Sequence, residues 1–326
     1  MGLFDRRDTF GPFEYPKAYD IWKLARVDAY WHPFNQTYEQ DVMDFKTKLD
    51  DKERNLIGNS LKSFTQLELI VGNEHWSKMA TWFPKPELQM LFLQFASDEM
   101  NHTVAYSQVD ENLGIKDYKG FLEDPIVRKK IDMLSTKSKT IEDKALSLAV
   151  FSGFTEGVQL FSAFAILLNF KRRKILPGIG KIITYSIRDE SLHSSTGCWL
   201  FRTLVKEYDF MSDSFKKKVY DAARHAVQLE DEFIDKAFEL GDVIGLAKND
   251  LKQFIRHRAN SKLKELGFKT NWKTIDTEAV RNIDEWFSLQ SGGSTLGDFF
   301  YERQTDYAKG NKNFSSTQIR RVFNGT

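Results

Sequence analysis

The sequence predicts an all-α protein, a helical bundle with extra flanking helices around one large core. Apolar residues recur at helical spacing from Tyr19 to about Leu266, with breaks at proline, glycine and asparagine. No alternating pattern long enough for a useful β-strand occurs. The chain has 326 residues, 41% hydrophobic and 14% aromatic, which is ample for one core. The lack of a polar linker favours one domain, over residues 1–290, followed by a flexible tail over residues 291–326.

The first predicted elements are an extended arm over residues 1–16 and a helix over residues 17–30. This helix ends before Pro33, because proline disfavours helical geometry in the residue that precedes it. A long helix opens at Asp50, whose carboxylate suits a helix N-terminus, and runs toward Trp76.

Prolines 84 and 86 mark the next turn, and the helix after it carries Glu99. Shorter pieces follow over residues 114–139. The most apolar helix starts at Thr140, and the sequence Pro177-Gly-Ile-Gly180 separates it from another long helix. Amphipathic helices over residues 213–240 and 251–266 complete the bundle. Beyond them, Gln290 to Thr295 reads as a flexible spacer, and Lys309 to Thr326 as a disordered segment or a partner-binding peptide.

Composition excludes several classes of function. The net charge of +1 provides no electrostatic footprint for nucleic acid or an anionic membrane. Residues 148–170 are apolar but contain Glu156 and Gln159, so we expect a buried core helix and not a membrane span. A single cysteine, Cys198, excludes an internal disulfide, and the start of the chain lacks a secretion signal. We therefore expect a cytoplasmic protein.

A repeated pattern predicts a dinuclear metal site. Glu-x-x-His occurs twice within helical segments, and each copy follows a lone glutamate at a similar interval: Glu68 before Glu99 and His102, and Glu156 before Glu190 and His193. Residues three apart lie on one face of a helix, so each pair can face the same point. Both lone glutamates lie in apolar stretches, where burying an unpaired carboxylate would cost several kcal/mol of free energy. A bound cation is the simplest partner that would remove this cost. Four carboxylates and two imidazoles from four helices form the ligand set of ferritin-like di-iron and di-manganese bundles.

The donor types suit iron or manganese, and the lack of cysteine ligands argues against structural zinc. Six ligands are more than one ion needs, so we expect two. Tyr106 follows His102 by about one helical turn and should lie beside the metals, where its phenol could be oxidised. Without the metals, Tyr106 would read as an ordinary buried aromatic residue.

These residues together resemble the radical-generating small subunit of class I ribonucleotide reductase. The resemblance rests on Glu68, Glu99-Met-Asn-His102 with Tyr106, Glu156, and Arg188-Asp-Glu190-Ser-Leu-His193. It extends from Tyr30-Trp-His-Pro33 to Phe299-Phe-Tyr-Glu-Arg-Gln-Thr-Asp-Tyr307, which is most of the chain.

The resemblance implies that a reduced metal pair reacts with dioxygen and oxidises Tyr106 to a stored radical. A separate large subunit then uses this oxidising equivalent to reduce ribonucleotides to deoxyribonucleotides. Transfer would run from the metal site through His102 and Asp189 to Trp31, and would reach the partner through Tyr307. Asp189 also has an independent role to play, because a second carboxylate can orient a ligand imidazole. A homodimer is expected as well.

Two features depart from the family. The first ligand is more often aspartate, and Glu68 is similar to the glutamate of manganese-iron relatives that lack the tyrosine. We favour two irons, with manganese at one or both positions as the competitor and a flavoprotein activator if manganese is used. The tail ends without the usual acidic, apolar-terminated pattern, so docking through residues 314–323 is a hypothesis.

Two other functions remain open. A ligand-binding manganese-iron oxidase would form a tyrosine–valine link; Val71 fits, but the tyrosine position is Phe151. A ferritin-like storage protein would bind iron without a lasting radical. We interpret His75 as an outer or surface imidazole and Cys198 as inert. His32, His225 and His257 lack a carboxylate at ligand spacing, Glu230-Asp-Glu232 reads as a solvated face, and Phe161, Phe164 and Phe170 are expected to seal the site from water.

Overall fold

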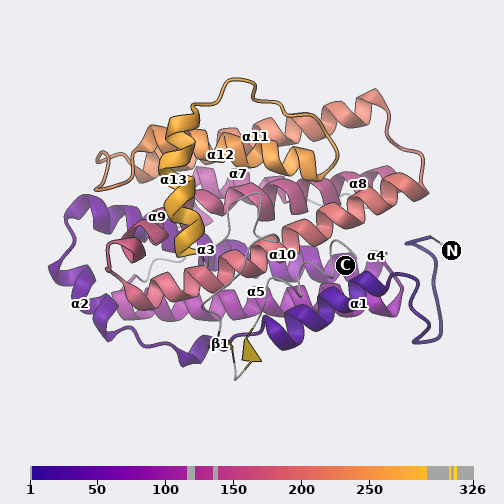
Figure 1. Ribbon diagram of the computed structural model, residues 1–326, viewed down its shortest axis with the longest axis horizontal. Coiled ribbons are helices and arrows are strands. Elements are labelled where there is room, and N and C mark those ends of the chain that lie inside the picture. Colours follow the sequence, from indigo (N-terminus) through magenta and orange to yellow (C-terminus); the bar gives the residue numbers. More distant parts are fainter. Residues whose placement is uncertain (1, 116–121, 135–138, 292–307, 310–311, 314–326) are drawn as a thin grey trace.

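The protein is helical throughout nearly all of the described chain, as predicted (Figure 1). A computed structural model describes residues 2–115, 122–134, 139–291, 308–309 and 312–313. In chain order, its elements are α1 (Pro16–Lys23), η1 (Leu24–Asp28), η2 (Pro33–Asn35), α2 (Glu39–Thr47), α3 (Asp51–Ile70), η3 (Val71–Trp76), α4 (Ser77–Trp82), α5 (Pro86–Leu113), α7 (Pro125–Met133), α8 (Ile141–Val150), η4 (Phe151–Gln159), α9 (Phe161–Arg172), α10 (Pro177–Glu207), α11 (Asp213–Ala237), α12 (Lys248–Glu265), α13 (Thr277–Gln290), β1 (Ala308–Lys309) and β2 (Lys312–Asn313).

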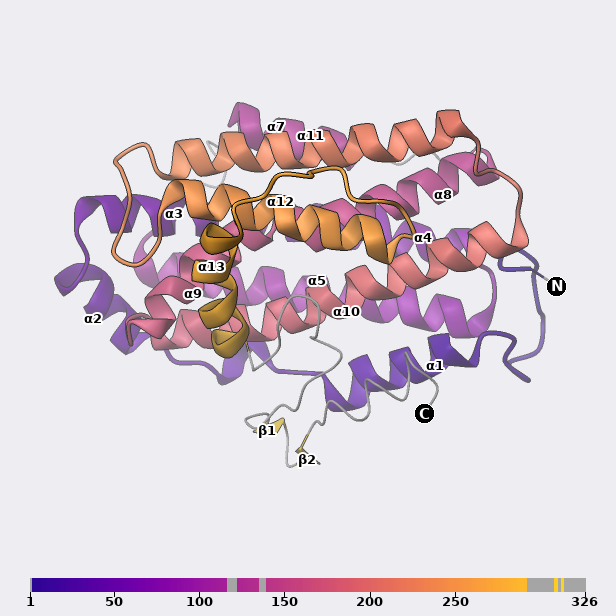
Figure 2. The same ribbon diagram turned by 45° about the horizontal axis from the view of Figure 1, so that its top comes forward.

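Four long helical rods form the centre of the bundle. They are α3 with its π-helical continuation η3, then α5, then the rod α8–η4–α9 with a central π-helical segment, and α10. Each rod packs against its neighbours through buried apolar side chains. Helices α11 and α12 lie side by side over η4, and α1 lies along α5 (Figures 1 and 2). The centre of the bundle is therefore shielded from water.

Local sequence signals set where these helices start, as expected. Asp50 accepts a hydrogen bond from the N–H of Glu53, whose side chain accepts one from the N–H of Asp50, and Thr140 forms the same reciprocal cap with Asp143. Helix α10 begins with Pro177 at its first turn. The two reciprocal caps at Asp50 and Thr140 satisfy N–H groups that have no partner within their own helix.

The predicted apolar helix is a core helix, as expected. Among the described residues, Ile141–Arg172 is the one helix long and apolar enough to cross a membrane. However, 94% of its apolar window is buried inside the bundle. Its surface is covered by α10, α11 and α12, so protein and not lipid surrounds it.

The sequence reasoning missed the helix α13, which runs across the long axes of its neighbours (Figure 2). Asp276 caps it by accepting from the N–H groups of Glu278 and Ala279. Ile283 and Phe287 are buried against the core and are spaced four residues apart, which is a signal the sequence did contain. Most of the predicted tail, including Tyr307, lies outside the described residues.

Close packing of α10 on η4 produces a testable requirement at Gly197. A Cβ atom there would lie 1.7 Å from Ser152 Oγ and 2.2 Å from Ser152 Cβ. We expect Gly197→Ala to lower the free energy of unfolding by about 1–3 kcal/mol, as overpacked cores do. Urea denaturation of the metal-free protein measures it.

Two variants control this prediction. Ser152→Gly in the Gly197→Ala background removes the clashing atoms and should recover most of the loss. Gly58→Ala on α3 meets nothing within 4 Å and should stabilise the protein, because alanine is the better helix former. A Gly197→Ala protein as stable as the wild type would show that the two helices do not pack this closely.

Candidate metal centre

All six predicted ligands point into the centre of the bundle. Their side chains are at most 1% exposed, and they come from the four central rods: Glu68 from α3, Glu99 and His102 from α5, Glu156 from η4, and Glu190 and His193 from α10. The i, i+3 spacing on α5 and α10 brings a carboxylate and an imidazole onto the same face of each helix. Far-separated parts of the chain thus converge at one place.

The ligand atoms fall into two overlapping sets that share two carboxylates. In each set, every ligand atom lies within 4.8 Å of the others; the sets are Glu68, Glu99, His102 and Glu190, and Glu99, Glu156, Glu190 and His193. Nδ1 of His102 lies 3.0 Å from Glu190 Oε1 and 3.2 Å from Glu99 Oε2. Nδ1 of His193 lies 3.0 Å from Glu99 Oε1 and 3.5 Å from Glu190 Oε2. These two sets would suit two ions, with Glu99 and Glu190 able to contribute to both.

The buried polar atoms fit a pair of cations. Within the described residues, both carboxylate oxygens of Glu156 and Oε1 of Glu68 make no hydrogen bond of acceptable geometry. Leaving such atoms buried without a partner is costly. Four carboxylates also balance the charge of two divalent cations. The residues present therefore match a dinuclear site in number, charge and donor type.

The pKa shifts of the metal-free cluster also favour binding of cations. Burial, followed by the charge of Glu190, raises the pKa of Glu68 and Glu156 well above the ordinary glutamate value. Burial lowers the pKa of His102, but Asp189 and the surrounding glutamates outweigh it and raise that pKa well above the ordinary value. The cluster thus holds protons when no cation is bound, and metal binding would release them.

Each ligand imidazole has a further carboxylate behind it. Nε2 of His102 lies 3.3 Å from Asp189 Oδ2, and this same oxygen accepts a 2.6 Å hydrogen bond from the indole N–H of Trp31. Nε2 of His193 lies 3.6 Å from Asp98 Oδ2. Carboxylates in this position fix the tautomer and orientation of a ligand imidazole.

Sequence reasoning missed Asp98, although the sequence carried its signal. The repeated unit is Asp-Glu-x-x-His, because Asp98 precedes Glu99 just as Asp189 precedes Glu190. It also missed Trp76, which is fully buried and donates its indole N–H to Glu99 Oε1 at 3.0 Å. No local pattern predicts that contact, since Trp76 lies on a different rod.

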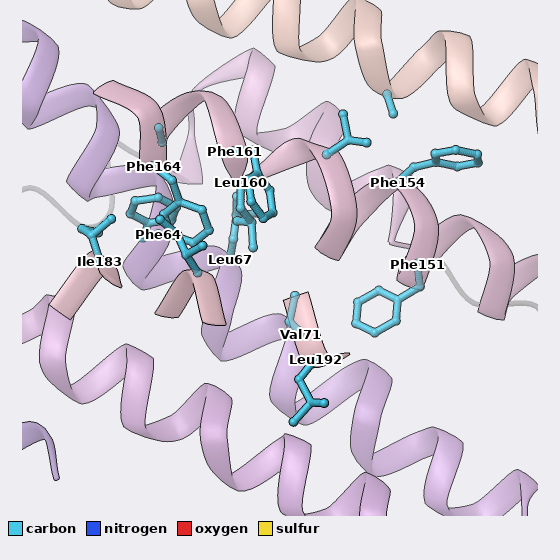
Figure 3. Close-up of a cluster of buried hydrophobic side chains, with 14 of the residues drawn as sticks. Phe64, Leu67, Val71, Phe151, Phe154, Leu160, Phe161, Phe164, Ile183 and Leu192 are labelled. Carbon is cyan, nitrogen blue, oxygen red and sulfur yellow. The ribbon is translucent and has the colours of Figure 1, made fainter. Parts of the chain in front are cut away.

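Tyr106 lies beside the ligand cluster in an apolar pocket. Its ring centroid is 6.3 Å from that of His102 and 4.9 Å from that of Phe64, and its hydroxyl donates to Ser186 Oγ at 2.7 Å. Phe64 in turn stacks on Phe164 at 4.9 Å, and Figure 3 shows these rings with Phe161 in one cluster. Burial, then the charge of Glu68, raises the pKa of the Tyr106 phenol well above its ordinary value. The phenol is therefore neutral and shielded from water.

The structure also shows the surroundings of Glu230, the remaining histidines and Cys198. Glu230 is fully buried and paired with Lys130, so the prediction of a solvated face was wrong for this residue: a buried lysine, not water, neutralises it.

His75 is 2% exposed and stacks on Phe151, and it belongs to neither ligand set. Cys198 is buried, and burial raises the pKa of its thiol, which suits an inert residue. His32, His225 and His257 are in neither set.

Comparison with known proteins decides the family. A family model described as ribonucleotide reductase, small chain, matches residues 7–279. The chain belongs to this family. As a ribonucleotide reductase small chain it is an oxidoreductase subunit, and this membership implies a large-subunit partner.

Relatives of this small chain occur in viruses and bacteria. A probable ribonucleoside-diphosphate reductase small subunit of Invertebrate iridescent virus 3 is 32% identical, over 94% of this chain and 86% of its own. A ribonucleoside-diphosphate reductase subunit beta of Chlamydia pneumoniae is 25% identical, over 91% and 88%. The match spans nearly the whole length of each protein.

Solved structures confirm the ferritin-like fold of the small chain. The dimanganese(II)-NrdF of Streptococcus sanguinis superposes with a TM-score of 0.76 at 18% identity, covering 88% of this chain and 99% of its own. A putative class I ribonucleotide reductase from Bacillus halodurans has the same TM-score at 21% identity, covering 83% and 100%.

Proposed function

We propose that this small chain stores an oxidising equivalent as a radical on Tyr106 and lends it to the large subunit for ribonucleotide reduction. The observation that carries the proposal is the ring contact between Tyr106 and His102, a member of a buried set of six ligands. When bound, the two ions would supply, with dioxygen, the one-electron oxidant for the phenol.

The side chains around Tyr106 suit storage of a radical. Tyr106 gives up one electron and its phenolic proton on oxidation, and stacked rings such as Phe64 keep water and reductants away from the oxygen. The tyrosine is 0% exposed, so nothing in solution contacts it directly. Exclusion of solvent should lengthen the lifetime of the radical.

A chain of contacts leads from the metal ligands toward the N-terminal part of the molecule. His102, Asp189 and Trp31 are linked by spacings of 3.3 Å and 2.6 Å, and the Trp31 ring stacks over His102 with centroids 5.9 Å apart. We propose that the oxidising equivalent leaves along this chain and reaches the large subunit through Tyr307 and the tail, with residues 314–323 as the docking segment. Both of these segments lie outside the described residues.

We retain two irons as the pair, and manganese in one or both positions is its competitor, which the dimanganese centre of the Streptococcus sanguinis relative supports. Manganese would bring a flavoprotein activator. We further propose a homodimer and a cytoplasmic location.

Metal loading of the wild type and of Tyr106→Phe tests this function. Protein loaded with iron alone, manganese alone, or both is exposed to air and followed by metal analysis, absorption and electron paramagnetic resonance. We expect a sharp tyrosyl signal in at least one loaded wild-type sample and none in Tyr106→Phe, which keeps the ring but has no phenolic oxygen.

The other outcomes identify the competing functions. A broad ferric spectrum without a tyrosyl signal would indicate storage. A tyrosine–valine cross-link in the mass spectrum would indicate the oxidase, although the position that supplies the tyrosine holds Phe151, which lacks the oxygen for such a link.

A further inference from the structure

The π-helical segment η4, which carries Glu156, is held from outside by side chains of three other helices. The carbonyl oxygens of η4 accept these hydrogen bonds at 2.6 to 3.2 Å: Ser152 O from Ser194 Oγ of α10, Gly157 O from Arg258 Nε of α12, and Gln159 O from Lys130 Nζ of α7. A widened turn departs from the i to i+4 spacing that pairs carbonyls inside an α-helix. Donors from neighbouring helices do not depend on that spacing.

Neighbouring helices also approach closely at Gly157, the residue next to the candidate metal ligand Glu156. A Cβ atom there would lie 2.8 Å from Ser194 Oγ and 2.9 Å from Lys262 Cδ, so α10 and α12 both press on the backbone at this point. This close approach allows the short bond from Arg258 to the Gly157 carbonyl. Glu156 is therefore one residue away from the point where η4, α10 and α12 pack together.

Arg258 is an unusual residue to find in such a core. It is 4% exposed, its guanidinium lies over the ring of Phe161, and burial lowers its pKa well below the ordinary arginine value. Arg256, on the same helix, instead makes a partly exposed ion pair with Asp231. Burying a cation costs free energy, so its presence beside η4 calls for a role that an apolar side chain would not fill.

We propose that Arg258, supported by Lys130, is a positioning residue that holds η4 in its widened form and so places the Glu156 carboxylate in the second ligand set. The inference rests on the metal-binding part of the proposed function. Glu156 belongs only to the set that includes His193, so loss of the Arg258 bond acts on one ion and not on both. The other set, with Glu68 and His102, does not include any residue of η4.

Three single variants separate the hydrogen bond from packing and charge. Arg258→Met keeps an unbranched stem but has no donor. Arg258→Gln carries its amide nitrogen the same number of bonds from the backbone as Arg Nε, so it can restore the bond without the charge. Arg256→Met removes a neighbouring guanidinium that pairs with Asp231 of α11, and it is the matched control. Manganese(II) binding is followed by the resonance signal of the free ion, and hydrogen exchange of residues 151–159 is measured without metal.

We expect Arg258→Met to weaken one of two manganese sites by tenfold or more, the size typical for groups that orient a ligand. Exchange over residues 151–159 should be faster in this variant. Arg258→Gln and Arg256→Met should stay within about threefold of the wild type in both measurements. Unchanged manganese binding in Arg258→Met, or an equal loss in Arg258→Gln, would overturn the proposal.

Two further arms keep the test decisive. If Arg258→Met does not fold, the double variant Lys130→Met with Glu230→Met replaces the buried ion pair by apolar side chains and removes the donor to Gln159 O, with Lys129→Met as its control. It should show the same loss at one site. If the wild type itself binds neither manganese nor iron, the metal centre fails, while the exchange rates of metal-free variants still decide whether Arg258 holds η4.

Discussion

Replacing Glu190 with alanine should abolish binding of both metal ions, whereas Glu156→Ala should abolish only one. The reason is that Glu190 belongs to both ligand sets and Glu156 to one. Each lost carboxylate removes a bond to the ion and the charge that balances it, and ligands of this kind account for most of the affinity. Metal analysis after loading and desalting should give close to zero ions for Glu190→Ala, about one for Glu156→Ala and two for the wild type.

The stability of the metal-free variants and a control variant are measured alongside the metal content. Glu156→Ala should not unfold more easily without metal, because its buried carboxylate, whose pKa burial and then the charge of Glu190 raise, is unfavourable there. Glu190→Ala should lose some stability without metal, because burial is outweighed by Glu156, His102 and His193, which hold the pKa of Glu190 below the ordinary value. Circular dichroism before loading shows that both variants are folded. Glu74→Ala, on the exposed side of η3, should bind two ions. Equal metal content in Glu190→Ala and Glu156→Ala would contradict the shared position of Glu190.

Asp189→Asn and Trp31→Phe should lower ribonucleotide reduction by more than about a hundredfold while leaving the Tyr106 radical in place. Asp189 bridges His102 and Trp31 through one oxygen; Trp31→Phe removes the indole N–H from this link, and Asp189→Asn removes the negative charge of the bridging carboxylate. Interrupting a linked set of groups in this way removes most of its effect at once, as in other catalytic networks. The radical yield by electron paramagnetic resonance and turnover with the large subunit measure the two quantities separately.

Asp98→Asn is the matched control for Asp189→Asn. Asp98 stands behind His193 as Asp189 stands behind His102, but its partner on the other side is Gln94, not a tryptophan. We expect Asp98→Asn to weaken metal binding modestly and to keep turnover in proportion to the radical present. A proportional loss of radical and turnover in Asp189→Asn as well would mean that Asp189 only orients His102 and carries no transfer.

Much of the candidate site could be predicted because its signals are local. Glu-x-x-His places two donors on one face of a helix, and the apolar neighbours of Glu68 and Glu156 show that these carboxylates must be buried. Helix starts at Asp50 and Thr140 follow from capping residues three positions apart. Such signals depend on a few neighbouring residues, so they can be recognised without knowing which helices pack together.

Contacts between distant segments could not be predicted in the same way. Trp76 and Glu99 are 23 positions apart, and Glu230 finds Lys130 across 100 positions. From the sequence, a charged residue such as Glu230 is expected to face solvent. Its partner Lys130 lies on another helix, so the pairing is known only once the two helices are packed together. The helix α13 was missed although its cap and apolar spacing are visible, because the chain before it lacks any periodic pattern.

The helical fold, the six candidate ligands and the family could be inferred from the sequence alone, since helical periodicity and ligand spacing are properties of short stretches of chain. The folded structure was needed to place Glu99 and Glu190 in both candidate ligand sets, to bring Ser186 to the Tyr106 hydroxyl, and to bring Arg258 to the carbonyl next to Glu156. These contacts depend on the distance and the rotation at which the rods pack against each other. Close-packed side chains throughout the core set that packing, and no short stretch of chain specifies it.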